Sequence, residues 1–277
     1  MIDIILAIAI ISSIIYFIIL ISLLSGMLKS SSKISNYKYK VSIVVSAHNE
    51  SKNIGNLLDD LLKQKYDKDL IEIIVVNDRS EDDTGDILLR YADIHKILKI
   101  ITINKADFSL SPKKYAISKA IEIAKGDIIL STDADCRLNK LWLESMISCF
   151  LPEVGAVAGL VILNPTKWIF SYLMIIDAIM NNLIIHGTLG WRFAVACKGG
   201  NFAYRKCVYD EVGGFTGLEK SLSGDDDLLL QKISTKSNWK IRSCINKEAL
   251  VESVAPANMS HFLSQRQRHI SASKYFN

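Results

Sequence analysis

Two aspartates separated by a single alanine, Asp133 and Asp135, form the motif with the clearest chemical potential. They follow a mostly apolar run at 127–132, and in an extended strand residues i and i+2 point to the same side. Paired hard oxygen ligands suit Mg²⁺ or Mn²⁺, and a metal held by one or two carboxylates usually shares its coordination with substrate phosphates. The alternative is an acidic turn that caps the following helix, because a D-x-D pattern alone does not decide between the two.

Three consecutive carboxylates, Asp225, Asp226 and Asp227, precede an apolar run at 228–230. The helix dipole favours negative charge at such a helix start. A solvated cap needs at most two of these carboxylates, so the third indicates a chemical task for one of them.

Two further segments combine residue types that suit a ligand. Gly199 and Gly200 precede a short predicted strand that ends near Arg205, and glycine lets a backbone approach a ligand closely, although a plain bulge is the alternative. In the tail, Gln265 and Arg268 share a helix face. A guanidinium there would clamp a phosphate leaving group, and a solvated basic helix is the alternative.

The elements that must position these groups alternate between strand and helix. Predicted strands lie at 41–45, 71–76, 97–103 and 127–132, with predicted helices between them. This alternation implies βαβ units and a parallel sheet, in which ligands bind outside the carboxyl ends of the strands. The segment 48–50, Asp78 and the D-x-D motif fall at those ends, which favours the metal interpretation. No glycine-rich dinucleotide pattern or Walker lysine pattern appears, so dinucleotide and P-loop sites are disfavoured.

The second half of the chain is less regular. We expect a helix from 139 to about 150 and one strand at 154–163. The segment 166–185 mixes aromatic and aliphatic residues with Asp177, Asn181 and Asn182. It predicts an amphipathic helix at a membrane interface or an ordinary core helix, and the pattern leaves both open.

The N-terminal run from Ile2 to Leu24 is apolar and long enough to span a bilayer. A signal peptide would have a positive start and a shorter apolar core, whereas here the only early charge is Asp3, so we expect an uncleaved anchor. Basic residues follow the span and none precedes it; they are Lys29, Lys33, Lys38 and Lys40. The positive-inside rule then predicts a single-pass anchor at 1–28 in the cell (inner) membrane, a basic linker at 29–40 and a cytoplasmic catalytic domain.

Composition narrows the function classes. The 277 residues are 49% hydrophobic and 22% charged, which is ample for a sizeable core. The net charge of +4 comes without a basic block, which argues against nucleic acid as a partner. The five cysteines form no CxxC pair, which fits reduced thiols better than a disulfide framework or a zinc site.

Taken together, the motifs resemble those of family 2 glycosyltransferases of the GT-A fold, in particular the membrane-bound branch that includes cellulose, hyaluronan and poly-N-acetylglucosamine synthases. The matching segments, in chain order, are Val41 to Glu50 (a strand and P-A-x-N-E), Asn77-Asp78, Lys113 to Ala120 (K-x-x-A-L-N), Asp133 to Asp135, Gly199 to Arg205 (G-G-N-x-A-x-R), Gly224 to Leu228 (E-D-x-D-L) and Gln265 to His269 (Q-x-x-R-W). Each motif is weak singly, but the ordered set over about residues 41–270 is specific. The resemblance implies a Rossmann-like GT-A domain at 41–257, with a mainly parallel sheet and flanking helices, and a Q-x-x-R-containing interface segment at 258–277.

The resemblance also implies roles for individual residues. The nucleotide of a UDP-sugar would contact Ala47, His48, Glu50, Asp78, Lys113 and Asp133. Asp133 and Asp135 would hold Mg²⁺ or Mn²⁺, with Asp135 as the direct ligand. Asp225 would be the catalytic base, with Asp226 and Asp227 as alternatives because adjacent carboxylates leave the register uncertain. The acceptor and diphosphate would meet Gly199, Gly200, Asn201, Gln265, Arg266 and Arg268.

The chain departs from the family pattern at four positions. Ser46 stands where the family has proline, and Asn77 where it has aspartate. Gly224 stands in place of glutamate, and His269 in place of tryptophan. The histidine weakens an assignment to processive synthesis, because that tryptophan lies beside the acceptor sugar in polymerising members. Relatives usually continue into membrane helices beyond the position of Asn277, so we expect either a short member or a segment of a longer design.

The expected function is an inverting, metal-dependent transfer of a sugar from a UDP-sugar to a hydroxyl acceptor in glycan or polysaccharide synthesis for the cell envelope. A lipid acceptor, such as polyprenyl phosphate or a glycolipid, is the alternative within enzymes. The alternative of another class is a non-catalytic nucleotide-binding subunit of a polysaccharide secretion complex. Membrane lipid and membrane-protein partners are expected in each case.

Overall fold

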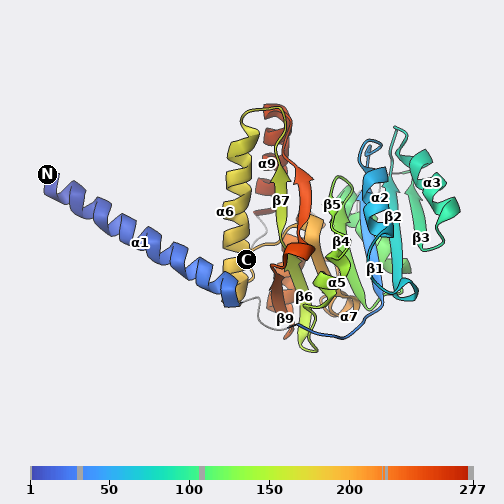
Figure 1. Cartoon of the computed structure of the whole chain (residues 1–277), viewed down its shortest axis with the longest axis horizontal. Helices are drawn as coiled ribbons and strands as arrows, with labels where there is room; N and C mark the ends of the chain where they lie inside the picture. The colour runs from blue at the N-terminus through green and yellow to red at the C-terminus, as the bar shows by residue number, and fades with distance from the viewer. Residues whose placement is uncertain (1, 30–33, 106–109, 220, 222–223, 274–277) are drawn as a thin grey trace.

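Short β-branched runs and the helices between them assemble into a seven-stranded sheet with helices on both faces (Figure 1). The structure, a computed structural model, describes residues 2–29, 34–105, 110–219, 221 and 224–273. In spatial order the strands are β3 (Leu98–Ile103), β2 (Ile71–Asp78), β1 (Val41–Ala47), β4 (Ile128–Asp133), β8 (Phe202–Arg205), β6 (Val154–Gly159) and β9 (Lys240–Cys244). The helices packed on it include α2 (Ile54–Leu62), α3 (Thr84–Ile94), α4 (Pro112–Ile123), α5 (Trp142–Ile147), α7 (Lys206–Glu211) and α8 (Asp227–Lys236).

The strand β1 lies at the centre of the parallel part of this sheet. It pairs in parallel with β2 and with β4. Ile43 and Val45 pack into the core on the side of α2 and α5, whereas Val44 packs on the side of α4. Because both faces are covered, β1 is apolar along nearly its whole length, as is typical of a parallel strand.

The register of the parallel strands brings their carboxyl ends to one edge. Ser46 of β1 lies opposite Val76 of β2 and opposite Asp133 of β4. The D-x-D motif therefore lies beside the ends of β1 and β2, as the strand–helix alternation predicts. The predicted α/β class with a mainly parallel sheet and flanking helices is confirmed.

Two predictions for the second half of the chain were wrong in detail. The single strand predicted at 154–163 is two strands, because the chain leaves the large sheet after Gly159 and enters a smaller sheet as β7 (Val161–Asn164). That sheet has the order β5-β10-β7 and also contains β5 (Arg137–Leu138) and β10 (Val251–Val254). The helix predicted at 139–150 is the shorter α5. In addition, β8 runs antiparallel to both β4 and β6, so the sheet is mixed.

A long apolar helix, α1 (Ile2–Lys29), projects away from the rest of the molecule and meets it at α6 (Ser171–Gly190) (Figure 1). Glycines make this contact close: a Cβ on Gly187 would lie 2.7 Å from the backbone oxygen of Leu23, and one on Gly190 would overlap Gly26. Small residues let two helices approach in this way. Both α1 and α6 are long and apolar enough to cross a membrane.

Aromatic and polar contacts complete the junction of α1 and α6. The Nε1 atom of Trp191 donates a hydrogen bond to the backbone oxygen of Ser22 (2.8 Å). The Nζ atom of Lys29 lies 3.3 Å from the centroid of the Trp191 ring.

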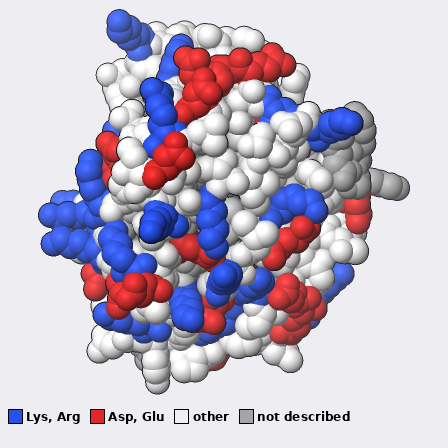
Figure 2. All heavy atoms as spheres, turned by 90° about the vertical axis from the view of Figure 1, so that its right-hand side faces the viewer, with Lys and Arg blue, Asp and Glu red and all other residues white. Residues whose placement is uncertain are grey.

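At the other end of the molecule, the face near β3 and α3 carries interleaved basic and acidic side chains (Figure 2).

The glycine contact between α1 and α6 leads to a prediction. In Gly190→Ala the new methyl group would overlap the backbone of Gly26, so the end of α1 must separate from α6. We expect amide hydrogen exchange at 22–29 and 186–193 to rise roughly tenfold or more, equivalent to about 1.4 kcal/mol of lost protection. The control is Gly55→Ala, where the nearest atom to the new Cβ is 3.8 Å away. Unchanged exchange at the junction in Gly190→Ala would contradict this account of the packing.

Candidate active site

The D-x-D motif lies at the end of β4 and in the turn that follows. Asp133 is the last residue of β4, and its backbone oxygen accepts a hydrogen bond from the amide of Cys136 (3.1 Å). Ala134 is buried between the two carboxylates, which are both half-buried. The turn thus fixes both aspartates at the carboxyl edge of the sheet.

The two aspartates form an oxygen-rich pair that fits a divalent cation. One ligand atom from each of Asp133, Asp135 and Cys136 lies within 4.8 Å of the others. Burial and the Asp133 carboxylate raise the pKa of Asp135, while a hydrogen bond from Ser253 of β10 (3.2 Å) opposes the shift. Burial and both carboxylates also raise the pKa of the Cys136 thiol, so the thiol stays protonated. The hard oxygens of the two aspartates are therefore the donors that suit Mg²⁺ or Mn²⁺.

Lys113, near the start of α4, joins the D-x-D motif to the second acidic segment. Its Nζ atom lies 2.7 Å from Oδ1 of Asp133 and 3.3 Å from Oδ2 of Asp225. Burial opposes the charged form, but the carboxylates of Asp133, Asp225 and Asp226 raise the pKa of Lys113 well above its ordinary value. The lysine is thus a fixed positive charge between the two clusters.

The three consecutive aspartates have different surroundings. Asp226 is the N-cap of α8 and accepts a hydrogen bond from the amide of Asp227 (2.9 Å). Asp227 accepts one from the amide of Cys197 (2.8 Å). Asp225 is buried and faces Lys113; burial raises its pKa, Lys113 lowers it, and Asp226 and Asp133 raise it further. Two of the carboxylates therefore bind backbone amides, and Asp225 is the one paired with the lysine.

Local backbone geometry explains the glycine before Asp225. Gly224 has φ +77°, in the left-handed region that glycine adopts without a steric penalty. The preceding segment is held by Lys114, which is fully buried and donates to the backbone oxygens of Leu218 (3.2 Å) and Ser221 (2.6 Å). Neighbouring lysines on α4 therefore position the acidic segment in two ways, one through carboxylates and one through backbone carbonyls.

The two glycines before β8 pack against both acidic clusters. A Cβ on Gly199 would lie 2.9 Å from Oδ2 of Asp226 and 3.2 Å from Nζ of Lys113. A Cβ on Gly200 would lie 3.1 Å from Oδ2 of Asp133. The glycines thus let the backbone pass directly beside the charged groups, as the sequence pattern predicts for a close backbone approach.

Asn201, the next residue, is a structural link in the core. Its Oδ1 atom accepts a hydrogen bond from Nε1 of Trp142 (3.0 Å), and its Nδ2 atom donates to the backbone oxygens of Leu160 and Ala249 (2.8 Å each). The side chain is fully buried, and its donors are both used. Its position holds Gly199 and Gly200 in place, while direct contact with a ligand stays a prediction.

The tips of β1 and β2 are tied together beside the D-x-D motif. Asn49 and Arg79 both adopt left-handed backbone conformations, with φ of 57° and 54°. The Nδ1 atom of His48 lies 2.6 Å from the backbone oxygen of Asp78, and Arg79 binds both carboxylate oxygens of Asp78 (2.7 and 3.0 Å). Strained non-glycine residues of this kind concentrate at functional sites.

Glu50 adds a carboxylate near Asp133 and Asp135, the proposed metal ligands. Burial raises the pKa of Glu50; a hydrogen bond from Asn53 lowers it, and the carboxylates of Asp135 and Asp133 raise it further. Ala47, the last residue of β1, is fully buried beneath these tips. The structure therefore brings the predicted nucleotide residues and the D-x-D motif to one edge.

The predicted tail residues are not all described. Arg266 lies on α9 (Met259–Ser273), where its guanidinium contacts Asp177 of α6 and lies 5.3 Å from the Phe262 ring centroid. In this structure Arg266 therefore joins α9 to α6. The side chains of Gln265, Arg268 and His269 lie outside the described residues.

Sequence reasoning missed two residues that support the site. Ser253, which contacts Asp135, lies in the short strand β10, between Glu252 and Val254. Lys114 follows the predicted Lys113, and its helical phase was the available signal, because it lies three and seven positions before the inward-facing Ile117 and Ile121.

The comparisons with known proteins agree with this arrangement. The model of glycosyl transferase family 2 matches residues 42–222. The chain belongs to this family. It is 30% identical over 196 residues to the probable glycosyltransferase YdaM of Bacillus subtilis, covering 69% of this chain and 46% of that protein. The chain spans about half or less of the length of the curated relatives it matches.

Solved structures show the same GT-A-like fold. The mannosyltransferase PcManGT from Pyrobaculum calidifontis, in complex with GDP-Man and Mn²⁺, has a TM-score of 0.71 at 20% identity and covers 98% of this chain and 76% of its own. TarS of S. aureus (residues 1–349) in complex with UDP has a TM-score of 0.53 at 19% identity, covering 84% and 65%.

The buried lysine leads to a prediction about stability. Lys114→Met removes the donor to two backbone oxygens, and a buried acceptor left without a partner costs about 1–3 kcal/mol. We expect the free energy of unfolding, measured by denaturant titration, to fall by that amount. Lys119→Met, on the same helix but half-exposed and in a surface ion pair with Glu122, should change it by no more than about 0.5 kcal/mol. Equal effects of the two substitutions would overturn the positioning role of Lys114.

Proposed function

We propose that the chain is a membrane-anchored, metal-dependent, inverting glycosyltransferase that moves a sugar from a UDP-sugar to a hydroxyl acceptor. The observation that carries this proposal is the position of Lys113, which lies 2.7 Å from Asp133 and 3.3 Å from Asp225. One positive charge thus links a pair of metal-binding carboxylates to a buried carboxylate suited to act as a base. Family membership supports glycosyl transfer as the reaction class.

The donor site would lie at the tips of β1, β2 and β4. His48, Glu50 and Asp78 would meet the nucleoside, and Lys113 would meet its diphosphate; the contacts among these residues and the D-x-D motif support this. The TarS structure holds UDP, which supports a UDP-sugar, whereas the PcManGT structure holds GDP-Man, so a guanine donor is the competing choice. Gly199 and Gly200 bring backbone directly beside the carboxylates, where it would approach the sugar diphosphate closely.

Asp133 and Asp135 would hold Mg²⁺ or Mn²⁺. When bound, the cation supplies positive charge that stabilises the departing diphosphate. Ser253 orients Asp135 through its hydrogen bond, and Lys113 adds a second positive charge from the side of α4. Preorganised charges of this kind stabilise a leaving group without further rearrangement.

Asp225 would act as the general base. Its carboxylate accepts the proton of the acceptor hydroxyl while that oxygen forms a bond to the anomeric carbon. The bond between the anomeric carbon and the diphosphate oxygen breaks on the opposite face, and its electron pair leaves with the diphosphate, so the configuration inverts. Burial raises the pKa of Asp225 and Lys113 opposes that rise, so the carboxylate is a buried group held in a fixed position by the lysine.

A lipid acceptor is the second candidate, and one surface favours it. The helix α6 exposes many large apolar side chains despite packing against the domain; they include Tyr172, Leu173, Ile176, Ile179 and Ile184. Such a face next to the α1 anchor would lie at a bilayer surface, where a lipid-linked acceptor would be within reach. The non-catalytic alternative is disfavoured because the groups of the D-x-D motif and the base are all present and mutually oriented.

The base assignment is tested by single substitutions of the three neighbouring aspartates. Asp225→Asn should lower turnover about 10²–10⁴-fold, the contribution of a positioned base, while UDP affinity is kept. Asp226→Asn and Asp227→Asn are the matched controls, because each makes the same carboxyl-to-amide change in the same segment. Turnover is measured as UDP release with a panel of UDP-sugars and acceptors, and UDP affinity by calorimetry. If Asp225→Asn keeps its turnover and one control loses it, that control residue is the base.

The metal assignment is tested by binding alone. Asp135→Ala should abolish the Mn²⁺-dependent part of UDP affinity, because it removes one of two carboxylate ligands. Ser253→Ala, which removes only the hydrogen bond to Asp135, should weaken that part about 10–100-fold, as expected for a residue that orients a ligand. Calorimetric titration of UDP with and without Mn²⁺ measures both. Undiminished UDP affinity of Asp135→Ala in Mn²⁺ would exclude Asp135 as a ligand.

A further inference from the structure

A cavity of about 660 Å³ lies at the opposite edge of the sheet from the D-x-D motif. It opens between the ends of α1 and α6 and the beginnings of β6 and β9. Since β8 is antiparallel to both β4 and β6, and β6 is parallel to β9, the beginnings of β6 and β9 lie at the edge where β4 starts. The cavity is therefore separate from the candidate active site, which lies where β4 ends.

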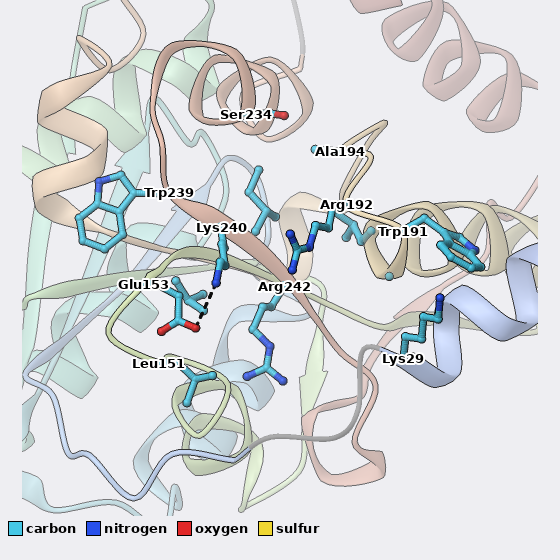
Figure 3. A pocket seen from close by; sticks show the side chains of 14 residues that line it. Lys29, Leu151, Glu153, Trp191, Arg192, Ala194, Ser234, Trp239, Lys240 and Arg242 are labelled. Carbon is cyan, nitrogen blue, oxygen red and sulfur yellow. Dashed lines mark hydrogen bonds and ion pairs between the residues drawn. The ribbon is translucent and has the colours of Figure 1, made fainter.

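The cavity is basic. Its lining includes Lys29 of α1, Arg192 after α6, and Lys240 and Arg242 of β9, with Glu153 as the single carboxylate of the lining. Arg192 extends into this space from the end of α6, and Lys240 and Arg242 extend into it from β9, while Lys29 lies beside Trp191 (Figure 3). Glu153 offsets one of these charges through its ion pair with Lys240 (3.4 Å). The excess of positive charge is suited to a phosphate group.

Arg192 is held in the cavity at a conformational cost. It follows the C-cap of α6, where its amide donates to the backbone oxygen of Leu189 (2.9 Å) and the amide of Phe193 donates to that of Thr188 (2.9 Å). This pair of bonds is a Schellman motif, whose left-handed position is usually glycine. Arg192 has φ +67° there, and a non-glycine residue in this region costs on the order of 1 kcal/mol or more. A strained arginine with its guanidinium in a basic cavity indicates a binding function.

The place of the cavity relative to α1 indicates the source of the phosphate. This step rests on the proposed function, in which α1 anchors the chain in the membrane. A helix of 27 residues extends about 40 Å, so its last residue, Lys29, lies at the headgroup level when the rest crosses the hydrocarbon core. Trp191, which binds Ser22 and Lys29, is of the residue type enriched at this level.

We propose that this cavity binds the phosphate of an anionic phospholipid headgroup at the membrane surface. A bound headgroup would connect Lys29 of the anchor, Arg192 at the end of α6 and the basic side chains of β9. It would thereby fix the catalytic domain against the bilayer at the junction of α1 and α6. Basic pockets beside membrane helices recognise anionic headgroups through this combination of charge and position.

The test uses the full chain in nanodiscs of phosphatidylcholine with or without phosphatidylglycerol. Native mass spectrometry after release counts the retained lipids, and thermal unfolding gives the melting temperature. We expect phosphatidylglycerol to be retained at least about fivefold over its share in the disc and to raise the melting temperature. Arg192→Gln removes the charge but keeps a non-glycine residue, and should lose the enrichment. Lys96→Gln, an equal charge change at the exposed turn before β3, should keep it.

Arg192→Gly separates binding from folding. Glycine relieves the left-handed backbone, so in pure phosphatidylcholine discs this variant should melt at or above the temperature of the unsubstituted chain, while it loses the response to phosphatidylglycerol. Full retention of phosphatidylglycerol by both Arg192 variants would overturn the proposal. So would a lower melting temperature of Arg192→Gly in phosphatidylcholine, because the arginine would then have a structural role.

Two further experiments identify the source of the phosphate and distinguish failure of the lipid site from failure of the proposed membrane anchor. Inorganic pyrophosphate should change the melting temperature in phosphatidylcholine equally in the unsubstituted chain and in Arg192→Gln, because it would bind beside Lys113 at the candidate active site. An Arg192-dependent increase would assign the cavity to a soluble phosphate and overturn the lipid assignment. Alkaline extraction of membranes that contain the chain tests the anchor: release of the chain would contradict both the anchoring and the lipid site, whereas retention without any lipid preference would contradict the lipid site alone.

Discussion

The crowding of carboxylates around Lys113 is the constraint on which the rest of the site depends. Asp133 comes from the end of β4 and Asp225 from the segment before α8, and the ammonium group of Lys113 contacts both. Two like charges about 4 Å apart repel by roughly 4 kcal/mol at the effective dielectric of a protein surface. Without a cation, these segments would therefore separate. The same repulsion lowers local stability and would favour the proposed cation at this edge, as is common at sites where function opposes local stability.

The parallel half of the fold could be predicted because its signals are local. Each buried strand is a run of β-branched residues, and the helix after it has a clear apolar face. The bounds of β1, β2, β3 and β4 could therefore be predicted to within one or two residues. The antiparallel β8 and the division of residues 154–163 into two strands carry no such signal. The chain changes sheets after Gly159 because Asn201 packs against that glycine and donates a hydrogen bond to the backbone oxygen of Leu160. Both contacts join residues that are distant in the sequence. Periodicity shows that a segment is extended, but it does not show which strand it pairs with.

The candidate site shows a similar division. Residue types at strand ends predicted the convergence of the D-x-D motif with Glu50 and Asp78, because parallel strands share an edge. The separate surroundings of Asp225, Asp226 and Asp227 could not be predicted, since they follow from which backbone amide each carboxylate meets. Lys113 and Lys114 make the same point. They are adjacent residues of the same type. One helical step along α4 nevertheless directs Lys113 toward carboxylates and Lys114 toward backbone carbonyls.

The sheet is thus charged differently at its two edges. Carboxylates gather at the edge where β4 ends, whereas Arg192, Lys240 and Arg242 gather at the edge where β6 and β9 begin. The strands β4, β8, β6 and β9 run between the two edges, so strand length sets the distance between them. A contact that fixes the basic edge at the end of α1 would therefore also fix the distance of the acidic edge from that helix. In the proposed membrane-anchored enzyme, the orientation of the candidate active site toward an acceptor would therefore be set at the opposite end of the sheet, where glycines bring α1 and α6 into close contact.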